Sequence, residues 1–188
     1  MPANPLGVAL RGRRAGHHTL AWARPGLQAP ESFTLTSPAF GHGEPIPPRY
    51  RGRLRGPNIS PALAWAPPPA GTAELALIVQ DPDVPIGKAA THVLALGIDP
   101  ALAGLPENAL ASPSPVPGIR FGKSALGRRG WAGPMPVRSH GPHTYAFQLF
   151  ALSQPLGLLA GFTLADVLTA APGRVLGRAR LDGTYEIR

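Results

Sequence analysis

Residues 74–85 read ELALIVQDPDVP, and this stretch decides the fold class. Residues 75–79 are all apolar, and no glycine or proline interrupts residues 74–80, which is typical of a buried β-strand. Proline at position 82 ends the strand, because proline cannot donate to a hydrogen-bonded ladder. The stretch therefore predicts a buried strand over 74–80, followed at once by two carboxylates, Asp81 and Asp83, whose directions are restricted by the prolines between and after them.

Other strands are expected on both sides of this one along the chain. Residues 143–152 alternate apolar and polar side chains most clearly, and further strand-length runs lie at 33–37, 62–65, 91–98 and 178–187. A helix is expected after Thr163, where Asp166 completes a variant of the capping box. No helix long enough for a parallel crossover separates the strands. The sequence therefore predicts a mainly β fold of antiparallel sheets joined by hairpins or Greek-key returns.

The length of 188 residues fits a single domain, and the formal charge of +8 comes from 16 arginines and two lysines against ten acidic residues. Four arginines and no acid occur in the first 30 residues, which predicts a basic N-terminal extension over 1–30 that could hold a short helix, and a folded domain over 31–188. Aromatic residues are not interleaved with the arginines, so a solvated surface is favoured over a nucleic-acid site.

The apolar content of the chain bears on its cellular location. No apolar run reaches the roughly 18 residues needed to cross a membrane. No apolar segment of the kind found in signal peptides comes after Arg13 and Arg14. The sequence therefore predicts no membrane span and a cytoplasmic location. The lack of cysteine excludes disulfides and thiolate metal sites.

Several polar side chains open or close neighbouring strands. Asp81 and Asp83 follow the buried strand, His92 opens the next one, and His143 opens a third beside Tyr145. Strand ends can converge at one rim of a sheet, where carboxylate, imidazole and phenol would surround one cavity. A simple capped turn at the two aspartates is the alternative. A metal site is disfavoured because no two ligands have the close spacing of zinc motifs, so neither metal nor cofactor is expected.

Six motifs in the same order resemble the phosphatidylethanolamine-binding protein family, and the bacterial branch often called Raf kinase inhibitor-like is the nearest match. The resemblance covers the chain from about Phe33 to the C-terminus. Its motifs are Ser37-Pro38-Ala39-Phe40, Ile46-Pro47, Asn58-Ile59-Ser60-Pro61, Asp81-Pro82-Asp83-Val84-Pro85 with His92, Gly133-Pro134-Met135-Pro136, and Gly141-Pro142-His143-Thr144-Tyr145.

The resemblance implies a large central antiparallel sheet packed on a smaller antiparallel sheet, with a few short peripheral helices. It also implies a small surface pocket for phosphate-like or carboxylate-like anions. Carried over motif by motif, the residues expected to line this pocket are Asp81, Pro85, His92, Gly133, Pro134, His143 and Tyr145. A backbone N–H near Gly133 and an imidazole N–H of His92 would donate to the anion, and Tyr145 would add a hydroxyl.

These features predict a non-enzymatic binding or regulatory protein whose ligand is a small anion or a phosphorylated group. A protein partner is compatible with this function, and a homodimer is an expectation taken from the family. The alternative is a hydrolase or lyase acting on a phosphate or carboxylate ester, with His92 as general base and Asp81 orienting it. Nucleic-acid binding through the arginines is a third, weaker hypothesis.

Overall fold

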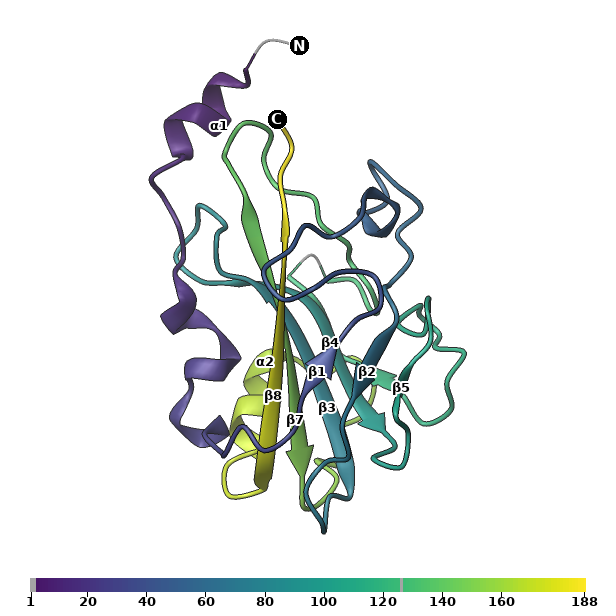
Figure 1. The fold of residues 1–188 in the computed structure, drawn as a ribbon. Helices are drawn as coiled ribbons and strands as arrows, with labels where there is room; N and C mark the ends of the chain where they lie inside the picture. The colour runs from purple at the N-terminus through teal and green to yellow at the C-terminus, as the bar shows by residue number, and fades with distance from the viewer. Residues whose placement is uncertain (1–2, 126) are drawn as a thin grey trace.

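The computed structural model describes residues 3–125 and 127–188. These ranges form two antiparallel β-sheets, of five and three strands, together with short helices outside the sheets (Figure 1). The mainly β fold predicted from the sequence is confirmed. In the part of the chain that is described, no helix combines the length and the apolar character needed to cross a membrane.

The larger sheet has the strand order β6-β4-β3-β7-β8. The central strand β3 is buried over its whole length, which explains why residues 75–79 are apolar without alternation. β3 and β4 form a hairpin, whereas residues 99–142 separate β4 from β7 on the other side of β3. The five strands are β3 (Glu74–Asp81), β4 (Ala90–Ile98), β6 (Arg120–Phe121), β7 (His143–Leu152) and β8 (Val175–Tyr185).

The smaller sheet packs on one face of the larger one and has the order β1-β2-β5. Its strands are β1 (Leu35–Thr36), β2 (Leu63–Trp65) and β5 (Gly104–Leu105). Alternate residues of β3, such as Leu77, contribute to the core between the sheets. Phe147 of β7 stacks on Trp131 there, with ring centroids 5.8 Å apart. This core holds the segment around Trp131 close to the end of the sheet that carries the polar residues.

A second core lies on the opposite face of the larger sheet. Ile78 and Phe150 pack there against helix α2 (Leu164–Ala170) and against Leu27 from the N-terminal part of the chain. The helix begins with the predicted capping box, because Thr163 and Asp166 bond each other's backbone N–H groups. β3 therefore serves two cores at once.

Residues 3–30 run along one side of the molecule (Figure 1) and contain α1 (Pro5–Leu10) and the 3₁₀ helices η1 (His17–Thr19), η2 (Ala21–Ala23) and η3 (Pro25–Leu27). The backbone N–H groups of Ala21 and Trp22 donate to the buried side-chain amides of Gln80 and Gln148, at 2.7 and 2.6 Å. These contacts attach the segment to the middle of the larger sheet. The division between an extension and a domain at residue 31 stays a prediction.

Candidate ligand pocket

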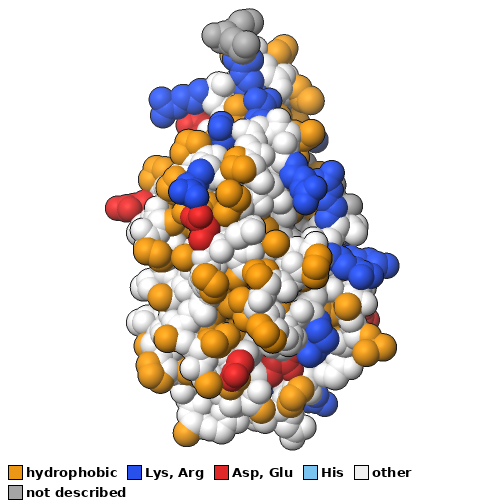
Figure 2. Space-filling model, turned by 90° about the vertical axis from the view of Figure 1, so that its right-hand side faces the viewer, with side chains coloured by type: hydrophobic (Ala, Val, Ile, Leu, Met, Phe, Trp, Pro, Cys, Tyr) orange, Lys and Arg blue, Asp and Glu red, His pale blue; other side chains and the backbone are white. Residues whose placement is uncertain are grey.

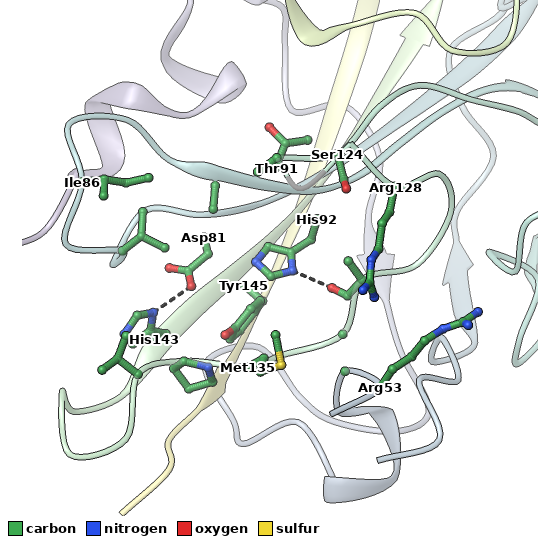
Figure 3. A pocket seen from close by; sticks show the side chains of 18 of the residues that line it. Arg53, Asp81, Ile86, Thr91, His92, Ser124, Arg128, Met135, His143 and Tyr145 are labelled. Atoms are coloured by element: carbon green, nitrogen blue, oxygen red, sulfur yellow. Dashed lines mark hydrogen bonds and ion pairs between the residues drawn. The ribbon is translucent and has the colours of Figure 1, made fainter. Parts of the chain in front are cut away.

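A cavity of about 270 Å³ lies where β3 ends and β4 and β7 begin (Figure 3). Of the seven residues predicted to line a pocket, six line this cavity: Asp81, Pro85, His92, Gly133, His143 and Tyr145. Pro134 does not line it, and its carbonyl instead accepts a hydrogen bond from Gly52 N–H at 3.1 Å. The structure thus brings together the polar residues of three strands, as their positions at strand ends predict.

A β-bulge places His92 at the cavity. Val79 of β3 pairs with Val93, whereas the next residue, Gln80, pairs with Thr91, so His92 is left as an extra residue in β4. Bulges of this kind bend a strand locally and redirect a side chain. The imidazole of His92 lies edge-on to the ring of Tyr145, with centroids 5.0 Å apart.

Asp81 is almost fully buried, and both of its carboxylate oxygens are used inside the protein. Oδ1 accepts from the backbone N–H of Asp83 at 2.7 Å, and Oδ2 lies 2.7 Å from Nδ1 of His143. The carboxylate is therefore held in one position and contacts His143 rather than His92.

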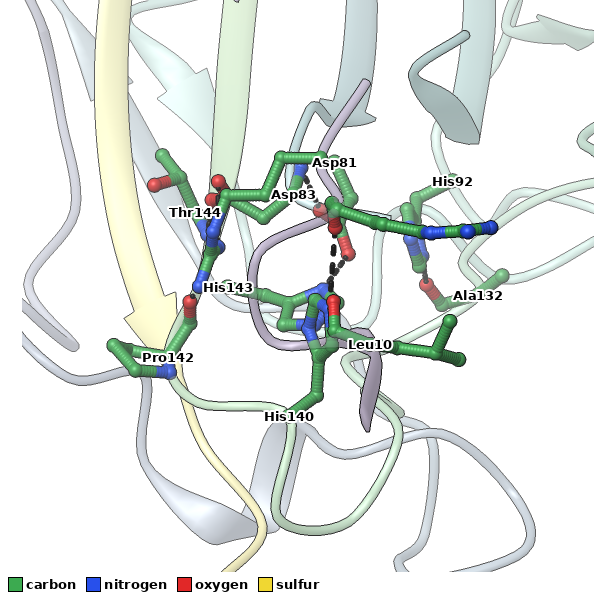
Figure 4. Close-up of polar contacts among 11 residues, drawn as sticks. Leu10, Asp81, Asp83, His92, Ala132, His140, Pro142, His143 and Thr144 are labelled. Carbon is green, nitrogen blue, oxygen red and sulfur yellow. Dashed lines mark hydrogen bonds and ion pairs between the residues drawn. The ribbon is translucent and has the colours of Figure 1, made fainter. Parts of the chain in front are cut away.

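The contact continues beyond the cavity through a second histidine (Figure 4). His143 Nε2 lies 2.7 Å from Nδ1 of His140, and Nε2 of His140 lies 2.8 Å from the carbonyl of Leu10 in α1. Three hydrogen bonds thus connect two groups that only accept, a carboxylate and a carbonyl. The Asp81 carboxylate is thereby connected through two imidazoles to the backbone of α1.

The resemblance implies that an imidazole N–H of His92 donates to the anion, but in the structure Nδ1 is bonded within the protein. This Nδ1 donates to the carbonyl of Ala132, which can only accept, so Nδ1 carries the proton. Burial lowers the pKa of His92, and the Ala132 bond and the Asp81 carboxylate oppose this shift without reversing it. The imidazole is therefore neutral near pH 7, and its Nε2 presents a lone pair that accepts a hydrogen bond.

Gly133 shapes the cavity through its backbone. Its N–H donates to Oδ1 of Asn58 at 3.0 Å, so this N–H is not free for an anion in the structure. A side chain at position 133 would collide with the carbonyl of Tyr50, which lies in η4 (Pro48–Tyr50). Asn58 has a positive φ of 58° and also donates to the carbonyl of Trp131. Asn58 therefore holds the 131–133 segment against the loop after η4.

Two buried hydroxyl groups of the cavity, Tyr145 Oη and Ser124 Oγ, form no hydrogen bond of good geometry with a described residue, although Tyr145 Oη lies near the Asp81 carboxylate and the backbone of Met135. Burial, and after it the negative charge of Asp81, raises the pKa of Tyr145 well above its usual value, so the phenol keeps its proton and can donate. Ser124 ends a stretch, residues 117–124, that nearly matches the phosphate-binding loop G-x-x-x-x-G-K-S. A proline stands in place of the first glycine and the sequence predicts no strand before it, so this motif does not assign Ser124 to a site.

Arg53 and Arg128 complete the lining on the side of the cavity opposite Asp81 and His143, as Figure 3 shows. Both side chains are exposed. Arg53 and Arg128 lie in two loops that are far apart in the sequence. The composition shows that the protein is basic, but it does not show that these two arginines meet at one cavity. Over the described residues, no group of three or more His, Asp and Glu side chains is placed to hold a metal ion.

Comparison with known proteins identifies relatives over most of the chain. A UPF0098 protein of Aquifex aeolicus is 40% identical over 151 residues, which span 80% of this chain and 86% of the relative. A Mycobacterium tuberculosis protein named as a lipoprotein, LppC, is 37% identical over 158 residues, spanning 84% of this chain and 74% of the relative. The crystal structure of CT736 from Chlamydia trachomatis, a homologue of phosphatidylethanolamine-binding protein, matches with a TM-score of 0.75 and 32% identity, covering 84% of this chain and 99% of that one.

The lipoprotein relative contradicts the cytoplasmic location that the sequence predicts. A lipoprotein is anchored to a membrane by its lipid, without any need for a membrane-spanning helix. The prediction depended on the lack of an apolar segment after Arg13 and Arg14. The lack of such a segment does not determine the cellular location of proteins with this fold. The assignment to the cytoplasm is withdrawn.

The family model that matches the chain is "Phosphatidylethanolamine-binding protein", and it covers residues 36–186. This range contains both sheets and the residues of β3, β4 and β7 that line the cavity. The motif order, the two-sheet architecture and the relatives all agree with this match. The chain belongs to the phosphatidylethanolamine-binding protein family.

Proposed function

We propose that this protein is a non-enzymatic binding or regulatory protein that holds a phosphate-like or carboxylate-like anion in the cavity lined by His92 and Tyr145. The observation that carries the proposal is the pair of buried hydroxyls, on Tyr145 and Ser124, that lack partners among the described residues. A buried donor without a partner is unfavourable, so a ligand that accepts from both hydroxyls would gain from satisfying them.

The charges of the site suit an anion better than the presence of Asp81 suggests. The carboxylate is bonded inside the protein, by the Asp83 N–H and by His143, and is not presented bare to a ligand. Arg53 and Arg128 then leave the cavity with a positive balance. The repulsion expected between Asp81 and a phosphate is therefore offset within the protein.

The neutral state of His92 favours a phosphate that keeps one proton. The P–OH group donates to Nε2 of His92, and the remaining oxygens accept from Tyr145, Ser124 and the arginines. An ionised carboxylate or the dianion of a phosphate monoester can accept from the hydroxyls but has no proton to donate to Nε2. The proposed ligand is thus a singly protonated phosphate, either small or attached to a partner molecule.

The ester-hydrolase alternative receives no support from the geometry. It requires Asp81 to orient His92, but Asp81 contacts His143, and His92 is oriented by the Ala132 carbonyl. The identity of a protein partner and the formation of a homodimer stay predictions.

Isothermal titration calorimetry with inorganic phosphate tests the proposal. We expect saturable binding to the wild-type protein, and a loss of about tenfold or more in affinity for Ser124→Ala and for His92→Ala, each of which removes one hydrogen bond of about 1.4 kcal/mol. Ser153→Ala is the matched control, because Ser153 lies outside the cavity. Phosphate affinities that are the same in all four proteins would contradict the proposal.

A further inference from the structure

We infer that the ligand carries a second anionic group linked to the first, and that this group binds in a neighbouring cavity formed by three arginines. The inference rests on the proposed function, since it extends the same site. It names the ligand class as a molecule with two linked phosphates, rather than a single phosphate or a carboxylate.

The neighbouring cavity has a volume of about 380 Å³ and is lined by Arg53, Ser112, Arg128, Arg129 and Trp131. Arg53 and Arg128 also line the first cavity, so the two cavities share these side chains and adjoin each other. Apart from the arginines, the lining offers one hydroxyl and one indole. Guanidinium groups bind phosphate with paired, parallel hydrogen bonds, which makes this lining suitable for phosphate.

The three arginines are not used elsewhere in the described structure. Their guanidinium groups form no ion pair and no hydrogen bond with any described residue, whereas Arg14, Arg49, Arg120, Arg178 and Arg180 are all paired with acids. Three neighbouring cations without a counter-charge repel one another, although exposure to water keeps this repulsion small. An anion between them removes the repulsion.

Hydrogen bonds to the backbone hold the loops that carry Arg53 and Arg128 in place. Asn58, at the end of the loop containing Arg53, bonds both the carbonyl of Trp131 and the N–H of Gly133. On the other side, Ser124 N–H donates to the carbonyl of Arg128. The backbone positions of the cationic side chains are thereby fixed before a ligand arrives, which reduces the ordering that binding requires.

The two cavities together have an unequal distribution of charge. Figure 3 shows Asp81 and His143 at one end and the two shared arginines at the other, with His92 between them. A protonated phosphate suits the end near His92, and a fully ionised phosphate suits the arginine end. Lys and Arg side chains also follow one another down the right-hand margin of the face in Figure 2, a charge distribution that attracts polyanions.

The test compares inorganic phosphate, pyrophosphate and tripolyphosphate by calorimetry at low ionic strength, in the wild-type protein and in Arg53→Ala/Arg129→Ala. The wild-type protein is expected to bind tripolyphosphate at least tenfold tighter than phosphate. In the double variant most of this gain disappears. The affinity for phosphate itself falls only by the contribution of Arg53, because Arg129 does not line the first cavity and Arg128, the hydroxyls and His92 are unchanged.

Arg13→Ala/Arg24→Ala is the matched control. It removes the same number of charges, and both side chains are exposed and line neither cavity. We expect it to keep the preference for tripolyphosphate within about twofold. An equal loss in the control would show a general charge effect and overturn the inference, as would an unchanged preference in the arginine variant.

A third variant separates failure of the second site from failure of the first. If His92→Ala abolishes phosphate binding but Arg53→Ala/Arg129→Ala keeps the tripolyphosphate preference, the second site is rejected and the proposed function stands. If His92→Ala changes neither phosphate nor tripolyphosphate binding, the proposed function is rejected together with the extension. Added salt at about 0.5 M should weaken tripolyphosphate binding more than phosphate binding, since the arginines are exposed and readily screened.

Discussion

At the scale of single residues, the pocket contains groups that are already satisfied and groups that are open. The Asp81 carboxylate and the Gly133 N–H have partners within the protein. The hydroxyls of Tyr145 and Ser124 have none among the described residues, and each such buried group costs about 1–3 kcal/mol. Mutation of the hydroxyls without partners should therefore change ligand affinity without lowering stability, whereas mutation of the groups that already have partners should change both.

Replacement of Tyr145 with phenylalanine tests this separation. We expect Tyr145→Phe to leave the free energy of unfolding unchanged or to raise it by about 1 kcal/mol, because the hydroxyl it removes is buried without a partner among the described residues. Phosphate affinity should fall about tenfold. Tyr50→Phe is the control, since the Tyr50 hydroxyl bonds Glu107 at 2.9 Å outside the cavity. It should lower stability in urea unfolding and leave phosphate binding intact; the reverse pattern in the two variants would refute the assignment.

The protonation state of His92 predicts a preference among anions. Because burial lowers the pKa of His92, its Nε2 accepts at neutral pH, and phosphate, which keeps a proton at pH 7, should bind roughly tenfold tighter than sulfate, which has none. A phosphate monoester loses its last proton near pH 6, so its affinity should fall as the pH rises from about 6 to 8. Calorimetry at several pH values measures both effects. An equal affinity for sulfate and phosphate, in wild type and in His92→Ala alike, would rule out this role for Nε2.

At the scale of elements, sequence patterns locate long strands well and short ones poorly. The strand over 74–80 and the alternating strand over 143–152 are visible in the sequence, since burial imposes a pattern on every residue. The two-residue strands β5 and β6 are too short to show a period. In the site, the residues at strand ends could be predicted from their motifs. Ser124, Arg128 and His140 could not, because only the folding of the 99–142 region brings them close to β3.

The attachment of the N-terminal segment depends on Asp83. Burial alone would raise the pKa of this carboxyl, but hydrogen bonds from Thr144 and Arg14 outweigh it, so the pKa is lowered. The resulting stabilisation is present above the unfolded-state value near 3.9 and is lost as the pH falls through the lower folded-state value. Asp83→Asn should therefore reduce hydrogen-exchange protection of residues 3–16 at pH 7, and the difference from wild type should disappear in strong acid.

Glu186→Gln is the matched control for Asp83→Asn, because it also removes one negative charge and breaks an ion pair with an arginine, in this case the exposed Arg188. Its hydrogen exchange over residues 3–16 should equal that of the wild type. Equal protection in Asp83→Asn and the wild type at pH 7 would show that the Arg14 contact does not hold the segment.

At the scale of the whole molecule, the larger sheet is covered on both faces, and the N-terminal residues supply part of the cover. Leu20 is fully buried against Ala89 and Ala146, and Leu27 joins the core on the α2 face. The histidine chain from Asp81 to the Leu10 carbonyl makes a further connection between the segment and the pocket. Residues outside the family match thus contribute to both the core and the site.

Leu20→Ala measures how far the N-terminal segment belongs to the fold. Removal of a fully buried leucine side chain is expected to cost about 2–5 kcal/mol in the free energy of unfolding. Leu54→Ala, at a position where the side chain is 80% exposed, should change it by less than about 0.5 kcal/mol. Urea unfolding compares the two. A small effect of both would mean that residues 3–30 contribute little to stability and behave as an extension.

The bulge in β4 makes the pocket depend on a single residue of that strand. His92 is the extra residue of the bulge, and its neighbours Thr91 and Val93 already face Gln80 and Val79. Deletion of residue 92 would make the pairing of Val79 and Gln80 with β4 regular, and the second register shift of this ladder, between Leu75 and Leu77, would be unaffected. A protein lacking this residue should keep its circular dichroism spectrum and lose phosphate binding. Phosphate recognition thus depends on one inserted residue in β4. Loss or return of this residue during evolution would remove or restore binding while the fold stays the same.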